Sequence, residues 1–308
     1  MVEEVRCAYA ALQYFQFDRS LIDIGTELGV SRFMVGRMVK RARDEGLISI
    51  TSHLPDPVDV QLSKAFATHF GIESALLVIT PSEDALANRR MIAAIAARNL
   101  RDTVVEDDII GLTVGRTIVE MSKLLTALPS CDVIQLTGVA DAHPERSVEA
   151  ITSISRLAGG RMFPLHAPFV TTDEAAAVAI RSQPGISKTL KRLERVSKAV
   201  VTIGAWPKAS LLYESLDGMG EATRLVNAGV VAEIGTTLLD IKGHEVQGLR
   251  NRLIGISTTQ LSAIKEVTAI GGAPGRAQAV LATLRSGLVT GLITDVHTAR
   301  EVLSLDAS

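Results

Sequence analysis

The chain has 308 residues, of which 47% are hydrophobic and 21% charged, and its formal net charge is −2. These values predict a globular protein with one large domain or a small and a large one, and they exclude a chain that is basic throughout. The two cysteines, Cys7 and Cys131, lie far apart and without metal-ligand spacing, which predicts no disulfide framework and no metal site. We expect no cofactor. With no signal-peptide pattern and no run of about 18 uncharged apolar residues, we expect a cytoplasmic protein without a membrane span.

Residues 1–50 are predicted to form an all-α domain with a helix-turn-helix. In the first helix Val5, Ala8, Leu12 and Phe15 recur at spacings of three and four residues, as on one apolar helix face. Ser20 and Ser31 are suited to cap the next two helices, and Gly29 between them permits the positive φ of a tight turn. Gly25 supplies a small residue where the two helices cross, and Gly46 ends the third helix.

The third helix is predicted to bind DNA. Five basic residues lie between Ser31 and Glu45, and the N-terminal part of such a helix enters the major groove. Arg32, Phe33 and Arg37 are expected at base edges, because arginine pairs bidentately with guanine and phenylalanine packs on a thymine methyl. Phosphate contacts are assigned to Ser31, Lys40 and Arg41. The alternative is a basic solvated helix in a three-helix bundle. One helix-turn-helix reads a single half-site, so we expect a homo-oligomer on a palindromic operator.

A linker is predicted after the DNA-binding domain. The apolar run 47–50 predicts a small strand, which would make the domain winged. Residues 51–57 read TSHLPDP, and Pro55 and Pro57 disfavour helix in the residues that precede them. Beyond this linker, an amphipathic helix over residues 58–70 begins a domain that extends to residue 308. We expect this domain to bind an effector and to oligomerise.

The large domain is predicted to be a doubly wound, mostly parallel α/β sheet. Short apolar runs rich in β-branched residues alternate with helical stretches, as in successive βα units. The predicted strands span residues 75–80, 108–113, 131–138, 199–205, 253–257, 266–272 and 291–295. The predicted helices span residues 84–101, 116–128, 147–158 and 275–286.

Three turns at the ends of predicted strands are candidates for an effector site, because ligands of open α/β sheets lie beyond the carboxyl ends of the strands. They are GLTVGRT (111–117), QLTG (135–138) and IGGAPGR (270–276). Their arginines favour a phosphate or another anion, or pair with a nearby carboxylate; such turns are also common in α/β domains without a ligand. The predicted effector residues are Thr113, Gly115, Arg116 and Thr117, then Thr137 and Gly138, then Gly271, Gly272 and Arg276.

Other polar residues have two interpretations each. Glu233, in an apolar context, accepts hydrogen bonds from sugar hydroxyls or satisfies a nearby arginine. Asp295 contacts a ligand or caps the helix from His297 onward. Trp206 stacks on a sugar or, as we prefer, anchors a packed loop. No compact Asp/Glu/His constellation predicts catalytic residues, so an isomerase-like or deaminase-like enzyme fused to a DNA-binding domain stands as the alternative function.

The chain resembles the SorC family of sugar-binding transcriptional regulators over nearly its whole length. The resemblance lies in the helix-turn-helix and in GLTVGRT, VIQLTG, PLHAPFV (164–170), VVAEIGTTLLDIKG (230–243), RLIGIS (252–257) and GGAPGRAQAVLATLRSGLVTGLITDVHTA (271–299). It implies an effector domain similar in fold to sugar-phosphate isomerases, which binds a sugar, sugar phosphate or polyol and thereby changes DNA affinity in a tetramer.

By the same resemblance, Gly115, Arg116 and Thr117 would form the anion-binding loop, Thr137 and Gly138 would line the pocket, and Glu233 would face the ligand. The chain departs from the family at two places. Arg276 stands where the family has lysine, and LTGV (136–139) replaces a strand end with an amide and a further glycine. Arginine and lysine differ in donor geometry, so these departures leave the phosphorylation of the effector open. The implied function is control of a carbohydrate or polyol catabolic operon.

Overall fold

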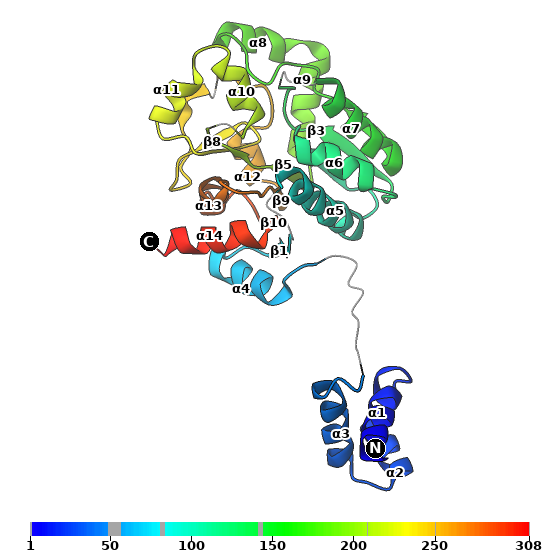
Figure 1. Cartoon of the computed structure of the whole chain (residues 1–308). Coiled ribbons are helices and arrows are strands. Elements are labelled where there is room, and N and C mark those ends of the chain that lie inside the picture. The colour runs from blue at the N-terminus through cyan, green and yellow to red at the C-terminus, as the bar shows by residue number, and fades with distance from the viewer. Residues whose placement is uncertain are drawn as a thin grey trace. The chain divides into compact units, whose positions relative to one another are not determined.

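The computed structural model describes residues 2–48, 57–80, 84–140, 144–207, 209–249 and 251–307. By internal contacts the chain divides into two units, residues 1–55 and 56–308 (Figure 1). The predicted linker, except for Pro57, and the second half of the predicted strand over 47–50 lie outside the described residues. Leu47 and Ile48 form a bend that packs against the N-terminal core, so the structure shows no wing strand at these two residues.

The N-terminal unit contains the three predicted helices, α1 (Val2–Phe15), α2 (Leu21–Leu28) and α3 (Arg32–Asp44). Both serine caps are confirmed. The Ser20 hydroxyl accepts a hydrogen bond from the Asp23 amide at 3.2 Å, and the Ser31 hydroxyl accepts one from the Met34 amide at 3.3 Å. Gly29 adopts a φ of 65°, as the turn between the two helices requires.

The prediction for the buried face of α1 is wrong. The side chains of Val5, Leu12 and Phe15 are exposed, whereas Cys7, Ala10 and Ala11 are at most 1% exposed. The reason is the close packing of α1 on α3, which small side chains permit and larger ones prevent. Apolar spacing identified the helix but not the face that it buries.

The large unit is built on a seven-stranded sheet in which every pairing is parallel. This confirms the predicted doubly wound α/β fold. Along the sheet the strands are β1 (Ser74–Val78), β10 (Gly291–Asp295), β9 (Glu266–Ile270), β5 (Lys198–Thr202), β2 (Ile109–Leu112), β3 (Cys131–Gln135) and β4 (Gly159–Phe163).

Helices cover both faces of this sheet, and alternate strand residues belong to separate cores. In β5, Ala199 and Val201 join one hydrophobic cluster while Val200 joins the other, as the two-residue period of a strand dictates. One core is completed by α5 (Ala85–Thr103), α6 (Arg116–Leu124) and α7 (Pro144–Ala158). The other is completed by α4 (Val60–Phe70), α13 (Ala277–Arg285) and α14 (Val296–Asp306).

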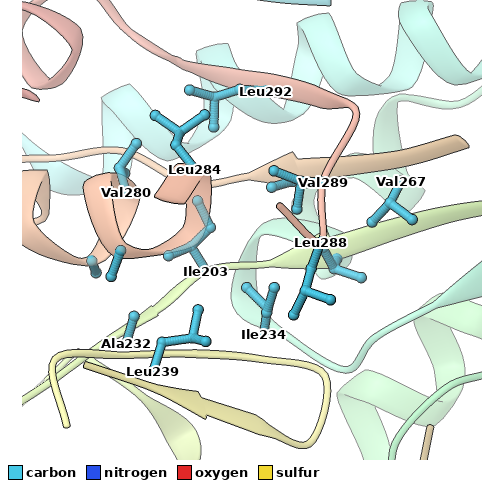
Figure 2. Close-up of a cluster of buried hydrophobic side chains, with 14 of the residues drawn as sticks. Ile203, Ala232, Ile234, Leu239, Val267, Val280, Leu284, Leu288, Val289 and Leu292 are labelled. Carbon is cyan, nitrogen blue, oxygen red and sulfur yellow. The ribbon is translucent and has the colours of Figure 1, made fainter. Parts of the chain in front are cut away.

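A small antiparallel sheet packs on α13. Its strands are β6 (Gly204–Ala205), β7 (Ala232–Ile234) and β8 (Thr237–Leu239). Figure 2 shows Val280 and Leu284 of α13 next to Ile203, which follows β5, with Ala232 and Leu239 of the small sheet on the far side. This shared core holds the small sheet against the carboxyl ends of the main strands.

The short elements escaped the sequence patterns. They are β4, β7, β8, α8 (Glu174–Ser182), α9 (Pro184–Arg192), α10 (Leu211–Asp217), α11 (Ala222–Asn227), α12 (Thr258–Ser262) and the 3₁₀ turns Leu193–Arg195 and Gln247–Leu249. The strand predicted over 253–257 is wrong: Leu253 and Gly255 make only isolated bridges, to Val170 and Thr137. The segment lies between the loops that contain Thr137 and Val170, and this packing buries its apolar residues although it belongs to no sheet.

Gly25 generates a prediction about the helix-turn-helix. A Cβ at Gly25 would lie 2.7 Å from the carbonyl oxygen of Val30, so Gly25→Ala must displace the turn and is expected to cost about 1–3 kcal/mol of unfolding free energy. Hydrogen exchange of the α2 and α3 amides in the full chain measures this loss. The matched control is Gly36→Ala on α3, where the nearest atom is 4.0 Å away and helix propensity favours alanine. Equal protection in the two variants would refute the close-packing role of Gly25.

Candidate functional site

The candidate site lies where the winding of the main sheet reverses. From β2 the chain passes through α6 to β3 on one side, whereas from β5 it continues to β9 on the other. Two neighbouring parallel strands thus send their following loops apart and leave a crevice at their carboxyl ends. Thr113 and Thr202 stand at its base: the Thr202 amide donates to the Thr113 hydroxyl at 2.9 Å, and the two hydroxyl oxygens lie 3.2 Å apart.

A narrow cavity of about 60 Å³ occupies this crevice. It brings together most of the predicted effector residues from loops far apart in sequence. Those that line it are Thr113, Gly115, Arg116, Thr117, Thr137, Glu233 and Arg276.

Three predicted glycines do not line this cavity, because each permits close packing elsewhere. A Cβ at Gly138 would lie 2.3 Å from the carbonyl oxygen of Pro168, and one at Gly271 would lie 3.2 Å from the Cβ of Ile203. A Cβ at Gly272 would lie 2.3 Å from a carboxylate oxygen of Asp295. These glycines therefore allow the segments around the cavity to pack closely, but they do not line it.

Gly115 lies at the cavity, and the side chain of Thr202 leaves no room for a side chain at this position. Its backbone is extended, with a φ of 173°, so its conformation is open to any residue. A Cβ there would nevertheless lie 2.7 Å from the Thr202 Cγ2 atom and 2.8 Å from its hydroxyl. A side chain at this position would separate the loops that follow β2 and β5.

Glu233 on β7 is 7% exposed and is held by side chains that the sequence analysis did not connect to it. The Ser210 hydroxyl donates to the carboxylate at 2.6 Å, and the Trp206 indole N–H donates to it as well. Burial raises the pKa of Glu233 to about 6, and its hydrogen bonds from Ser210 and Trp206 and the charge of Arg276 moderate the rise. Gly204 leaves room for the carboxylate, since a Cβ there would lie 2.2 Å from it.

Arginine side chains give the cavity its positive charge. Arg276 is half-buried and donates to the carbonyl oxygen of Ile203 at 3.1 Å. Arg116, the first residue of α6, forms an ion pair with Glu214 on α10. Arg89 on α5 also lines the cavity and was missed. Burial, together with the neighbouring guanidinium groups, lowers the pKa of Arg89 and of Arg276.

The missed polar residues of the site are Arg89, Thr202 and Ser210. Ser210 caps α10, so a cap pattern could have suggested it, whereas Thr202 ends β5 but lies in the middle of the strand predicted over residues 199–205. Arg89 lies inside a helix, and its spacing carries no comparable signal.

Two residues with alternative interpretations have structural partners. Asp295 caps α14: its carboxylate accepts hydrogen bonds from the amide and the hydroxyl of Thr298, each at 2.7 Å. Trp206 is buried and packs edge-on against Tyr213, with 5.3 Å between ring centroids. It anchors the loop before α10.

On the N-terminal unit, all six residues predicted to contact DNA are exposed. The Arg32 guanidinium lies 4.8 Å from the centroid of the Phe33 ring. Arg41 is engaged by Glu45 at 2.7 Å and by Glu3 at 3.0 Å, so its charge is partly neutralised. Arg37 and Lys40 form no ion pair with any residue of the described ranges, which leaves them open to a ligand.

Comparisons with known proteins relate nearly the whole chain to transcriptional regulators, and its large unit to a sugar-binding domain. A family model described as "Putative sugar-binding domain" matches residues 58–304. The uncharacterized transcriptional regulator YjhU of Escherichia coli (strain K12) is 26% identical over 97% of this chain and 94% of its own length. The deoxyribonucleoside regulator of Bacillus subtilis (strain 168) is 22% identical over 96% of each.

The fold is shared with a solved structure over nearly the whole of this chain. The full-length sorbitol operon regulator SorC from Klebsiella pneumoniae superposes with a TM-score of 0.72 over 98% of this chain and all of that one, at 18% identity. A helical N-terminal unit followed by a sugar-binding α/β unit defines a class of transcription regulators. The chain belongs to the SorC family of sugar-binding transcriptional regulators. Among the described helices, none combines the length and apolar character needed to cross a bilayer.

The buried carboxylate predicts a pH dependence of stability. Each pKa unit corresponds to about 1.4 kcal/mol, so a pKa raised from 4.5 to about 6 costs the native state roughly 2 kcal/mol once Glu233 is ionised. Below pH 4.5 the carboxyl group is protonated in both the folded and the unfolded state, so the full unfolding free energy is present. As the pH rises from 4.5 through 6, the unfolded state ionises first, and the unfolding free energy falls. Glu233→Gln should remove this loss, so its unfolding free energy relative to wild type should rise by about 2 kcal/mol between pH 4 and 7. Denaturant unfolding measures it, with exposed Glu174→Gln as control; parallel curves for Glu233→Gln and wild type would contradict the assignment.

Proposed function

We propose that this protein controls a carbohydrate or polyol catabolic operon. Residues 1–50 bind a palindromic operator, and residues 51–57 link them to residues 58–308, which bind an effector and form the oligomer. The oligomer is a tetramer and acts in the cytoplasm. The observation that carries the proposal is the polar, arginine-lined cavity at the switch point of the sheet, in a chain whose other unit exposes a basic recognition helix.

Some exposed residues of α3 contact base edges, and others contact the phosphate backbone. Arg32, Phe33 and Arg37 lie in its first two turns, the part of a recognition helix that meets base edges. Ser31 and Lys40 contact phosphates and contribute salt-dependent affinity. Arg41 makes the weaker phosphate contact because Glu3 and Glu45 compete for it.

The cavity suits a small polyhydroxylated effector. Thr113, Thr137, Thr202 and Ser210 offer hydroxyl groups that both donate and accept, and Glu233 offers a carboxylate already oriented by its partners. The names of two relatives, a deoxyribonucleoside regulator and a sorbitol operon regulator, support a ligand of this class. The effector changes operator affinity by binding the two DNA-binding states of the protein unequally.

We infer a regulator rather than an enzyme. Among the described residues that line the cavity, Glu233 is the one carboxylate and there is no histidine or lysine. General acid–base chemistry on a sugar commonly needs a second proton-transfer group beside the carboxylate, and none of these lining residues supplies one. An effector that stabilises the protein and is recovered unchanged supports this inference; turnover of that effector contradicts it.

Arg37→Ala tests the DNA-binding assignment. Loss of a bidentate base contact should reduce affinity for the operator by about 10- to 100-fold, corresponding to 1–3 kcal/mol, while effector binding is unchanged. Fluorescence anisotropy on an operator selected from a random DNA pool, and on its scrambled sequence, gives the specificity ratio. Arg43→Ala is the matched control, since Arg43 is exposed on the same helix and pairs with Asp44. A specificity ratio in Arg37→Ala equal to that of the control would disprove the assignment.

Gly115→Ala tests the effector pocket. The added methyl group collides with Thr202, so the loops separate and effector affinity should fall at least about 10-fold, the effect of 1.4 kcal/mol, while operator binding without effector persists. Thermal shift with a panel of sugars, polyols and sugar phosphates measures binding. The control is Gly185→Ala on α9, where a Cβ meets no atom within 4 Å. Unaltered effector affinity in Gly115→Ala would place the effector elsewhere.

A further inference from the structure

Arg89 is the least satisfied charge at the candidate site. Its side chain, half-buried on α5, has no hydrogen bond or ion pair with any residue that the structure describes. The next residue, Arg90, projects differently: it is largely exposed and lies 3.6 Å from the carboxylate of Glu120. Adjacent arginines on one helix thus differ in environment, one paired at the surface and one unpaired at a cavity.

The surroundings of Arg89 are positive. Arg116 and Arg276 line the same narrow cavity, and the one carboxylate among its described lining residues is Glu233. Arg116 is paired with Glu214 and Arg276 with the Ile203 carbonyl, whereas Arg89 forms no ion pair in the described ranges, and the charge of Glu120 offsets its burial only in part. The proximity of Arg116 contributes, after burial, to the lowered pKa of Arg89. A half-buried cation held near like charges is unfavourable unless a ligand neutralises it.

The position of Arg89 shows where an anion fits. A second cavity of about 610 Å³, between α5, α6 and α7, adjoins the narrow one, and Arg89 and Arg116 are the charged residues that line both. Ligand pockets commonly enclose about 300–1,000 Å³, so the two cavities together have the space that the narrow one lacks. The N-terminus of α6, with Gly115 before it, lies at the same junction and favours negative charge.

We propose that Arg89 is the specificity-determining cation of this pocket, which binds the oxyanion of a polyhydroxylated effector at the junction of the two cavities. The inference rests on the proposed function of the pocket and extends it: the effector carries a phosphate ester or a carboxylate, not hydroxyl groups alone. A guanidinium presents paired N–H donors to such an oxyanion. The hydroxyl groups of the effector then face Thr113, Ser210 and the other polar residues of the narrow cavity.

The experiment is a thermal shift of the full-length protein with inorganic phosphate, against sodium chloride at the same ionic strength. Phosphate should stabilise the wild type and Arg90→Ala, and its apparent Kd should rise at least about 10-fold in Arg89→Ala, as for loss of a charge-assisted hydrogen bond. Without phosphate, Arg89→Ala should be at least as stable as wild type, because the substitution removes a half-buried charge and its repulsion by Arg116. Arg89→Lys, which keeps the charge without the paired donors, should give an intermediate Kd.

Two results would overturn the proposal: phosphate that does not stabilise the wild type, or an equal Kd in Arg89→Ala and Arg90→Ala. A destabilised apo form of both Arg89 variants would assign Arg89 a structural role instead and also count against it. Acetate in place of phosphate separates the two oxyanion sources, and a response to either that requires Arg89 supports the proposal.

Operator release separates this inference from the proposed function. If a neutral sugar or polyol releases the operator from wild type and Arg89→Ala equally, the pocket is regulatory and Arg89 is not its selector. If phosphate binding requires Arg89 but no sugar, polyol or sugar phosphate alters operator affinity, the anion site stands and the regulatory function falls.

Discussion

The pairing of β2 with β5 is the constraint on which the site depends. These neighbouring parallel strands send the following chain in opposite directions, which leaves a crevice beyond their carboxyl ends. Thr113 and Thr202 join the two strand ends by hydrogen bonds, which fixes the base of the crevice while satisfying polar groups that burial would otherwise leave unpaired. Gly115 lets the two loops approach without a side chain between them.

The upper wall depends on a second element, the small sheet that α13 holds in place. Because β7 packs on α13 (Figure 2), Glu233 is carried to the crevice in a buried setting. Its carboxylate is then stabilised by Trp206 and Ser210, and these bonds attach the loop before α10 to the sheet. The ion pair between Glu214 and Arg116 attaches α10 to the opposite wall. The site is therefore a polar network with an excess of positive charge, which is the property that makes Arg89 informative.

The N-terminal unit shows a different physical solution. Its core is small and combines Cys7, Ala10, Ala11 and Ala42 with an equal number of larger residues from α2 and α3, namely Ile24, Val35, Met38 and Val39. Small side chains allow the three helices to pack closely, and Gly25 allows the turn to approach α2. The same geometry leaves larger apolar residues of α1 exposed and directs the basic residues of α3 outward.

Short-range interactions that can be read from the sequence were sufficient to predict many of the secondary-structure elements and part of the site. Serine caps, a glycine with positive φ and β-branched runs act within a few residues, so the helix-turn-helix, most long helices and six of the seven main strands could be predicted. The strand-end turns also identified Thr113, Gly115, Arg116 and Arg276, because residues after parallel strands gather at one edge. Tertiary structure alone decided which helix face is buried, which glycines serve packing, and that Glu233 is held by Trp206 and Ser210. It alone brought Arg89, in the middle of a long helix, beside Arg116 and Arg276, since contacts between residues so distant in sequence depend on strand order and not on local spacing.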